Sequence, residues 1–100
     1  MEFAAKVADV PNFGKKQVTI NGTEVLLINI KGEIFACESE CPHQGAPLGG
    51  GIVKEGHLSC PRHGYRFDLN TGACRDASQF TLKVYPVQIS GDDILVDLGS

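Results

Sequence analysis

Two short segments of the sequence each combine one thiol with one imidazole. Cys41-Pro42-His43 and Cys60-Pro61-Arg62-His63 together form the pattern C-x-H-x16-C-x2-H. Structural zinc sites usually take cysteines at C-x2-4-C and histidines at H-x3-5-H spacings, so the C-x-H segment is too short for that arrangement. Two thiolates and two imidazoles better suit a two-iron centre in which cysteines hold one iron and histidines hold the other. The pattern therefore favours a mixed-ligand [2Fe-2S] cluster.

The elements that must position these ligands are short strands. Turn signals recur at short intervals and separate β-branched, apolar runs, which is typical of an all-β protein. Asn21-Gly22 favours a type I′ hairpin turn because both central residues of that turn need a positive φ. Lys31-Gly32 and Gly91-Asp92-Asp93 mark two further turns. The expected strands are residues 17–20, 24–28, 34–37, 84–89 and 94–96.

A glycine-rich stretch, roughly residues 41–75, interrupts this pattern of hairpins and contains all four candidate ligands. Glycines cost backbone entropy on folding, but they allow backbone amides to approach a ligand closely. We therefore expect this stretch to be an insertion that holds the metal centre. Its glycines are Gly45, Gly49, Gly50, Gly51, Gly56, Gly64 and Gly72.

The two segments, continued as Gln44 to Leu48 and Gly64 to Asp68, resemble the Rieske [2Fe-2S] family, and specifically its small ferredoxins. The resemblance covers nearly the whole chain. It implies a single Rieske domain over residues 1–100, all-β, with an antiparallel sandwich or barrel as base and a cluster-binding subdomain at about 38–75. It also implies one [2Fe-2S] cluster per chain. The implied ligands are Cys41 and Cys60 on the inner iron and His43 and His63 on the outer iron.

Four positions near the ligands bear on the reduction potential. High-potential relatives carry a cysteine pair that forms a disulfide, together with a serine and a tyrosine whose hydroxyls donate to the cluster. In this chain those positions are Ala46, Arg62, Tyr65 and Phe67. Because neither the disulfide nor the two hydroxyls are in place, we predict a low-potential centre, near the bottom of a range of roughly −150 to +300 mV.

Composition excludes several classes of function. The formal net charge is −3 and neither sign forms a long run, which argues against binding nucleic acid through phosphate neutralisation. No run approaches the 18 or more apolar residues typical of a membrane span, and the first residues lack the pattern of a signal peptide. We therefore expect a cytoplasmic, monomeric protein whose partners are other proteins.

The remaining cysteines and histidine have simpler interpretations. Cys37 and Cys74 are expected to be small buried residues in strands and not ligands. His57 is expected on a strand surface, and this single spare histidine cannot supply the two histidines of a mononuclear non-haem iron oxygenase. Arg62 is expected near the exposed tip, where it could contact an acidic partner. Residues 75–79 lack the proline common in relatives, so we expect a more mobile loop there.

No phosphate-binding loop, nucleophile and base pair, or open metal position is present, so the sequence predicts an electron carrier and not an enzyme. By resemblance, the first choice is the ferredoxin that passes electrons from a flavin reductase to a terminal oxygenase. The second is the small Rieske subunit of an NAD(P)H nitrite reductase. A structural zinc-binding module is the alternative of another class.

Overall fold

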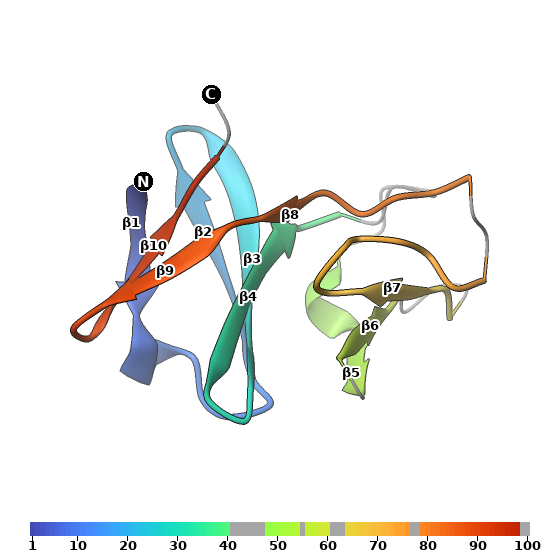
Figure 1. The fold of residues 1–100 in the computed structure, drawn as a ribbon, viewed down its shortest axis with the longest axis horizontal. Helices are drawn as coiled ribbons and strands as arrows, with labels where there is room; N and C mark the ends of the chain where they lie inside the picture. The colour runs from blue at the N-terminus through green and yellow to red at the C-terminus, as the bar shows by residue number, and fades with distance from the viewer. Residues whose placement is uncertain (41–47, 55, 61–63, 77–78, 99–100) are drawn as a thin grey trace.

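The computed structural model describes residues 1–40, 48–54, 56–60, 64–76 and 79–98. Its strands form three antiparallel sheets (Figure 1). Two of these sheets form the base. A three-stranded sheet has the order β1-β10-β9 and a four-stranded sheet the order β2-β3-β4-β8. The strands of the base are β1 (Glu2–Lys6), β2 (Lys15–Ile20), β3 (Thr23–Ile30), β4 (Glu33–Glu38), β8 (Val84–Tyr85), β9 (Val87–Ser90) and β10 (Asp93–Val96).

The two predicted hairpins at the centre of the base are confirmed. β2 pairs with β3 and β3 with β4, in antiparallel register throughout. Both residues of Asn21-Gly22 have positive φ (50° and 82°), as do both residues of Lys31-Gly32 (54° and 90°). These are the backbone values that a type I′ turn requires, so the turn chemistry of the sequence sets the register of three strands.

The strand expected at residues 84–89 is instead two strands. Pro86 separates β8 from β9, and β8 pairs with β4 whereas β9 pairs with β10. Proline has no backbone N–H to donate to a sheet, which is why the ladder breaks there. The chain therefore passes from one sheet of the base to the other at Pro86. The predicted hairpin between β9 and β10 is present, with Gly91 at φ 61°. Strand β1, which pairs with β10, was not predicted.

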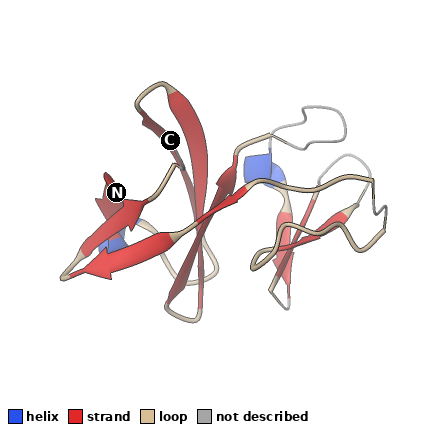
Figure 2. Cartoon of the chain, turned by 45° about the horizontal axis from the view of Figure 1, so that its top comes forward, coloured by secondary structure: helices blue, strands red, loops and turns tan. Residues whose placement is uncertain are grey.

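The third sheet lies between β4 and β8 in the sequence and to one side of the base in space (Figures 1 and 2). It consists of β5 (Ile52–Lys54), β6 (His57–Ser59) and β7 (Arg66–Asp68) in that order. All three strands fall within the predicted cluster-binding range of 38–75. The two helical segments of the described chain are short 3-10 turns, η1 (Val7–Asp9) and η2 (Leu48–Gly50). Among the described residues, no helix is long and apolar enough to cross a membrane.

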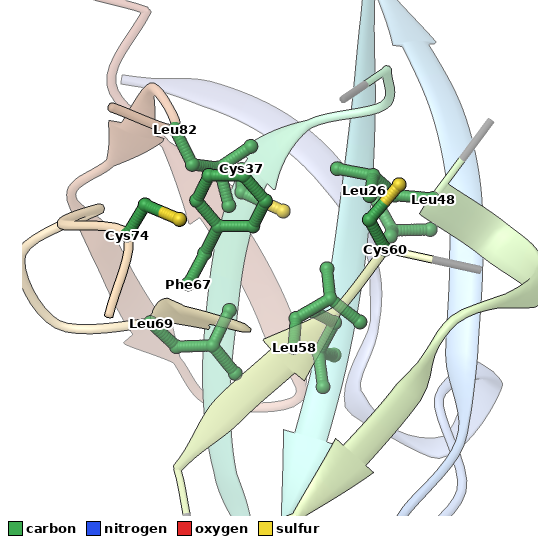
Figure 3. Close-up of a cluster of buried hydrophobic side chains, with 10 residues drawn as sticks. Leu26, Cys37, Leu48, Leu58, Cys60, Phe67, Leu69, Cys74 and Leu82 are labelled. Atoms are coloured by element: carbon green, nitrogen blue, oxygen red, sulfur yellow. The ribbon is translucent and has the colours of Figure 1, made fainter. Parts of the chain in front are cut away.

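Two hydrophobic clusters hold these parts together. One lies within the base and includes Val25, Leu27, Ile94 and Val96. The other joins the base to the third sheet, because Leu26 and Ile28 of β3 pack with residues of that sheet. Figure 3 shows Leu26 of the base beside Leu58 and Cys60. Alternate residues of β3 thus serve opposite faces, which explains why its central run is buried on both sides. We call this second cluster the bridging core; its buried members are Leu26, Ile28, Cys37, Leu48, Leu58, Cys60, Phe67, Leu69, Cys74 and Leu82.

Candidate metal centre

Cys60 is the predicted ligand that the structure describes. It follows directly after β6, and only 2% of its surface is exposed. Its side chain belongs to the bridging core, and Figure 3 shows its sulfur beside Leu26 and Leu48. Cys41, His43 and His63 lie outside the described residues, so the assignment of the four ligands stays a prediction. Among the described residues alone, no three His, Cys, Asp or Glu side chains are grouped to hold a metal ion.

The segment that contains His63 is closed at its base by two backbone hydrogen bonds. The Cys60 N–H donates to the Tyr65 carbonyl at 2.8 Å, and the Gly64 N–H donates to the Cys60 carbonyl at 2.9 Å. Gly64 has a φ of 72°, a value that glycine adopts without strain. The Tyr65 ring stacks on that of Phe80, with 6.0 Å between the ring centroids. These contacts hold Cys60, Gly64 and Tyr65, which flank residues 61–63 in the sequence.

The segment that contains Cys41 and His43 is closed in a similar way. The Leu48 N–H donates to the Ser39 carbonyl at 2.8 Å, and both residues are buried. The η2 turn follows, and the Gly51 N–H donates to the Leu48 carbonyl at 2.9 Å. Because Leu48 and Cys60 belong to the same bridging core, the bases of the two predicted ligand loops are held by one set of packed side chains.

A hollow of about 390 Å³ lies beside Cys60 and is lined by Gly50, Ile52, Ser59, Cys60 and Gly64. Two of the five described residues that line it, Gly50 and Gly64, are glycines, so backbone atoms form part of the described wall. A thiol at the edge of a hollow with exposed backbone suits the binding of an iron-sulfur cluster, whose sulfides accept hydrogen bonds from N–H groups. The described part of the site, with one of the four predicted ligands, therefore fits the [2Fe-2S] cluster that the sequence predicts.

The other two cysteines are buried, as predicted, and belong to the bridging core, although only Cys37 lies in a strand. Cys37 is fully buried in β4, and burial together with the nearby Glu38 raises the pKa of its thiol to about 12. Cys74 is 7% exposed and forms an isolated β-bridge with Phe67. Neither forms a disulfide. A thiol with so high a pKa stays protonated at neutral pH, which suits a packing role and not metal binding.

Two of the positions predicted to set the potential are described. Phe67 is fully buried in the bridging core, and Tyr65 is partly buried against Phe80. The other two, Ala46 and Arg62, lie outside the described residues. His57 is on strand β6 and is partly exposed, in agreement with its predicted place. The low potential stays a prediction.

The start of the loop at residues 75–79 is anchored, which sequence reasoning missed. The Arg75 N–H donates to the Arg66 carbonyl at 2.8 Å. Asp76 accepts hydrogen bonds from the Arg66 backbone N–H and from Nη2 of its side chain, both at 2.8 Å. These hydrogen bonds from Arg66 lower the pKa of Asp76 to about 2. No sequence pattern indicates this pair, because its residues are ten positions apart and meet only through the fold. Residues 77–78 lie outside the described residues.

Comparisons with known proteins identify the family of the chain. The family model of the Rieske [2Fe-2S] domain matches residues 2–86. The ferredoxin component of the naphthalene 1,2-dioxygenase system of Pseudomonas aeruginosa is 34% identical, over 95% of this chain and 92% of its own.

Solved structures share the fold. The ferredoxin of carbazole 1,9a-dioxygenase from Nocardioides aromaticivorans IC177 is 26% identical, with a TM-score of 0.86 over 96% of this chain and 97% of that one. A Mycobacterium tuberculosis protein, described as the small subunit of an NADH-dependent nitrite reductase, is 24% identical, with a TM-score of 0.87 over 94% of this chain and 90% of that one. At this identity, the second likeness shows the fold alone. The family match over residues 2–86 and the likeness to the naphthalene dioxygenase ferredoxin show that the chain belongs to the Rieske [2Fe-2S] domain family and carries one [2Fe-2S] cluster.

Proposed function

We propose that this chain is the ferredoxin of a multicomponent oxygenase, which takes one electron at a time from a flavin reductase and passes it to a terminal oxygenase. The observation that carries the proposal is the likeness to the naphthalene dioxygenase ferredoxin over nearly the full length of both chains. The bound cluster supplies a site that gains and loses one electron. The chain's own residues hold that site on a packed β scaffold, with Cys60 at its inner edge.

The proposed ligands are Cys41 and Cys60 on one iron and His43 and His63 on the other. A matched pair of variants tests the described member of this set. Cys60→Ala and Cys74→Ala remove the same atoms from the same bridging core. We expect Cys60→Ala to lose the cluster, measured as iron content and visible absorbance, and Cys74→Ala to keep it. Equal retention in the two variants would contradict the assignment.

Electron relay is tested with the purified holoprotein, a flavin reductase and the carbazole terminal oxygenase. The expected results are a rhombic EPR signal of low average g on reduction and hydroxylation of carbazole that depends on the ferredoxin. Metal analysis of the same sample tests the zinc alternative, since a colourless protein with one zinc per chain would overturn the proposal.

The nitrite reductase alternative is supported by the shared fold with the Mycobacterium tuberculosis protein. A small subunit of that enzyme would copurify with a large sirohaem subunit, whereas a ferredoxin elutes alone as a monomer. Gel filtration of a cell extract, followed by immunoblotting, separates the two outcomes.

We also propose a single domain over residues 1–100, with its cluster-binding part at about 38–75. The proposed location is the cytoplasm. The thiols of Cys37 and Cys74 support a reducing compartment.

A further inference from the structure

The outer face of the β5-β6-β7 sheet carries a polar and cationic set of side chains. Along these three short strands, alternate residues point to opposite sides. Val53, Leu58 and Phe67 pack in or against the bridging core. The outward residues line a hollow of about 310 Å³, which we call the basic face. It is formed by Ile52, Lys54, His57, Ser59, Arg66 and Arg75.

The charge of the basic face is opposite to that of the whole chain. Lys54, Arg66 and Arg75 line the hollow, and none of the described residues that line it is a carboxylate. Asp76 is paired with Arg66 beside it, and Asp68 stands opposite His57 in the register of the strands. Among the described residues of this face, the three cations exceed these two carboxylates by one charge, whereas the chain has a formal net charge of −3. The described side chains that line the hollow thus present three cations on one side of the third sheet.

One large apolar side chain, Ile52, lies among the cations of the basic face. Ile52 is 69% exposed, which is the largest exposed fraction among the exposed large hydrophobic residues of the described chain. Ile52 and Ser59 line both the basic face and the hollow beside Cys60. The basic face is therefore continuous with the predicted cluster site. An exposed apolar centre with a charged rim is the usual plan of a transient protein interface.

We infer that the basic face is the docking surface for a redox partner protein whose own contact surface has carboxylates around an apolar centre. This inference rests on the proposed function, and it adds the place of docking and the chemistry of the partner. The rim cations would attract the partner and orient it, which governs the association rate more than the affinity. Ile52 would bury its side chain in the complex and slow dissociation. Continuity with the hollow at Cys60 would bring the partner close to the cluster.

The test uses flavodoxin, an acidic flavoprotein, as a defined electron donor. One electron passes from its hydroquinone to the oxidised cluster, which leaves the flavin semiquinone and the reduced cluster, and no covalent bond forms or breaks. Stopped-flow absorbance gives the second-order rate constant across a salt series. If the basic face guides docking, the rate falls as salt rises, although both proteins carry net negative charge. A rate that rises with salt, or does not change, would overturn the inference.

Two double variants with the same change of net charge locate the effect. Lys54→Gln/Arg75→Gln removes two cations of the basic face, and Lys6→Gln/Lys31→Gln removes two exposed cations of the base. At low salt, we expect about a tenfold slower reaction for the first variant and less than about a twofold change for the second. The difference should vanish at high salt. Equal slowing of both variants would mean that net charge alone acts, and would contradict a localised docking surface.

A third variant tests the apolar centre without changing charge. Ile52→Ser should slow the reaction at every salt concentration, and a rate equal to that of the wild type would remove Ile52 from the interface. The visible spectrum, the EPR signal and the midpoint potential of the two charge variants should match the wild type. Because Ile52 also lines the hollow beside Cys60, the midpoint potential of Ile52→Ser is measured as well, and its rate is compared with that of the wild type at equal driving force. Failure of the proposed function would look different, because the wild-type holoprotein would then pass no electrons to the terminal oxygenase while flavodoxin still reduced its cluster.

Discussion

Two glycines with positive φ offer a sharp test of how the cluster-binding part is packed. Gly72 (φ 82°) donates its N–H to the Asp68 carbonyl at 2.6 Å, and its own carbonyl accepts the Leu82 N–H at 2.7 Å. A Cβ at position 72 would overlap the Leu82 carbonyl. Gly91 (φ 61°) lies in the β9-β10 turn, and a Cβ there would meet nothing within 4 Å. A non-glycine residue would be strained at both positions, but only position 91 has room for a Cβ.

The expected costs follow from this difference. Substitution by alanine at either position places an L-residue in the left-handed region, at about 1–2 kcal/mol. Gly72→Ala must also displace Leu82, which breaks a hydrogen bond worth about 0.5–1.5 kcal/mol. It also loosens a Leu82 side chain that is only 1% exposed. We therefore expect Gly72→Ala to cost roughly 2 kcal/mol more than Gly91→Ala, which is about 8–16 °C in Tm for a domain of this size.

Thermal unfolding of the two holoproteins at one scan rate measures the effect, followed by far-ultraviolet circular dichroism and by visible absorbance. Gly72→Ala should also release its cluster at the lower temperature, because Leu82 belongs to the bridging core that holds Cys60. If the two variants unfold within about 4 °C of each other, the close approach of Gly72 to Leu82 does not govern stability, and the reasoning fails.

Three further predictions concern the potential and two ionisable groups. Redox titration should give a midpoint near the bottom of the family range of roughly −150 to +300 mV, and a midpoint above zero would contradict the interpretation of Ala46, Arg62, Tyr65 and Phe67. Because the folded-state pKa of Asp76 is lowered to about 2, its pairing with Arg66 stabilises the fold fully above about pH 4 and is lost as the pH falls toward 2. At pH 6, the wild-type holoprotein should therefore keep its cluster for longer than the Asp76→Asn holoprotein. This difference in cluster lifetime should shrink as the pH falls toward 2, and a difference that does not change with pH would count against the pairing. With a pKa of about 12, the buried Cys37 thiol should resist iodoacetamide at pH 8 until the protein unfolds, as followed by mass spectrometry.

The sequence was informative wherever local chemistry decides the structure. Asn21-Gly22 and Lys31-Gly32 predicted two hairpins because their positive φ values are a property of the turn residues themselves. It was less informative where distant residues decide. Strand β1 pairs with β10 near the other end of the chain, and Ala5 is its one buried residue, so no alternating pattern reveals it. The prediction of one strand at residues 84–89 gave Pro86 too little weight.

The candidate site shows the same division. The identity and spacing of Cys41, His43, Cys60 and His63 point to the type of cluster, because ligand chemistry resides in residue types. The bridging core that holds Cys60, and the pairing of Asp76 with Arg66, arise from contacts between distant segments. Pattern alone could not supply these contacts, since they depend on how the third sheet packs against β3.

The ends of the segment between β4 and β8 lie against each other. Glu38 donates its N–H to the Lys83 carbonyl at 2.9 Å, and the Lys83 N–H donates to Glu38 Oε2 at 2.7 Å. The chain therefore leaves the base and returns to it at one point. Such an insertion can be exchanged between related scaffolds only where the base offers matching apolar residues, because Leu26, Ile28 and Cys37 are buried against it in the bridging core. Grafting residues 39–82 onto another β base would show how far metal binding and scaffold can evolve independently.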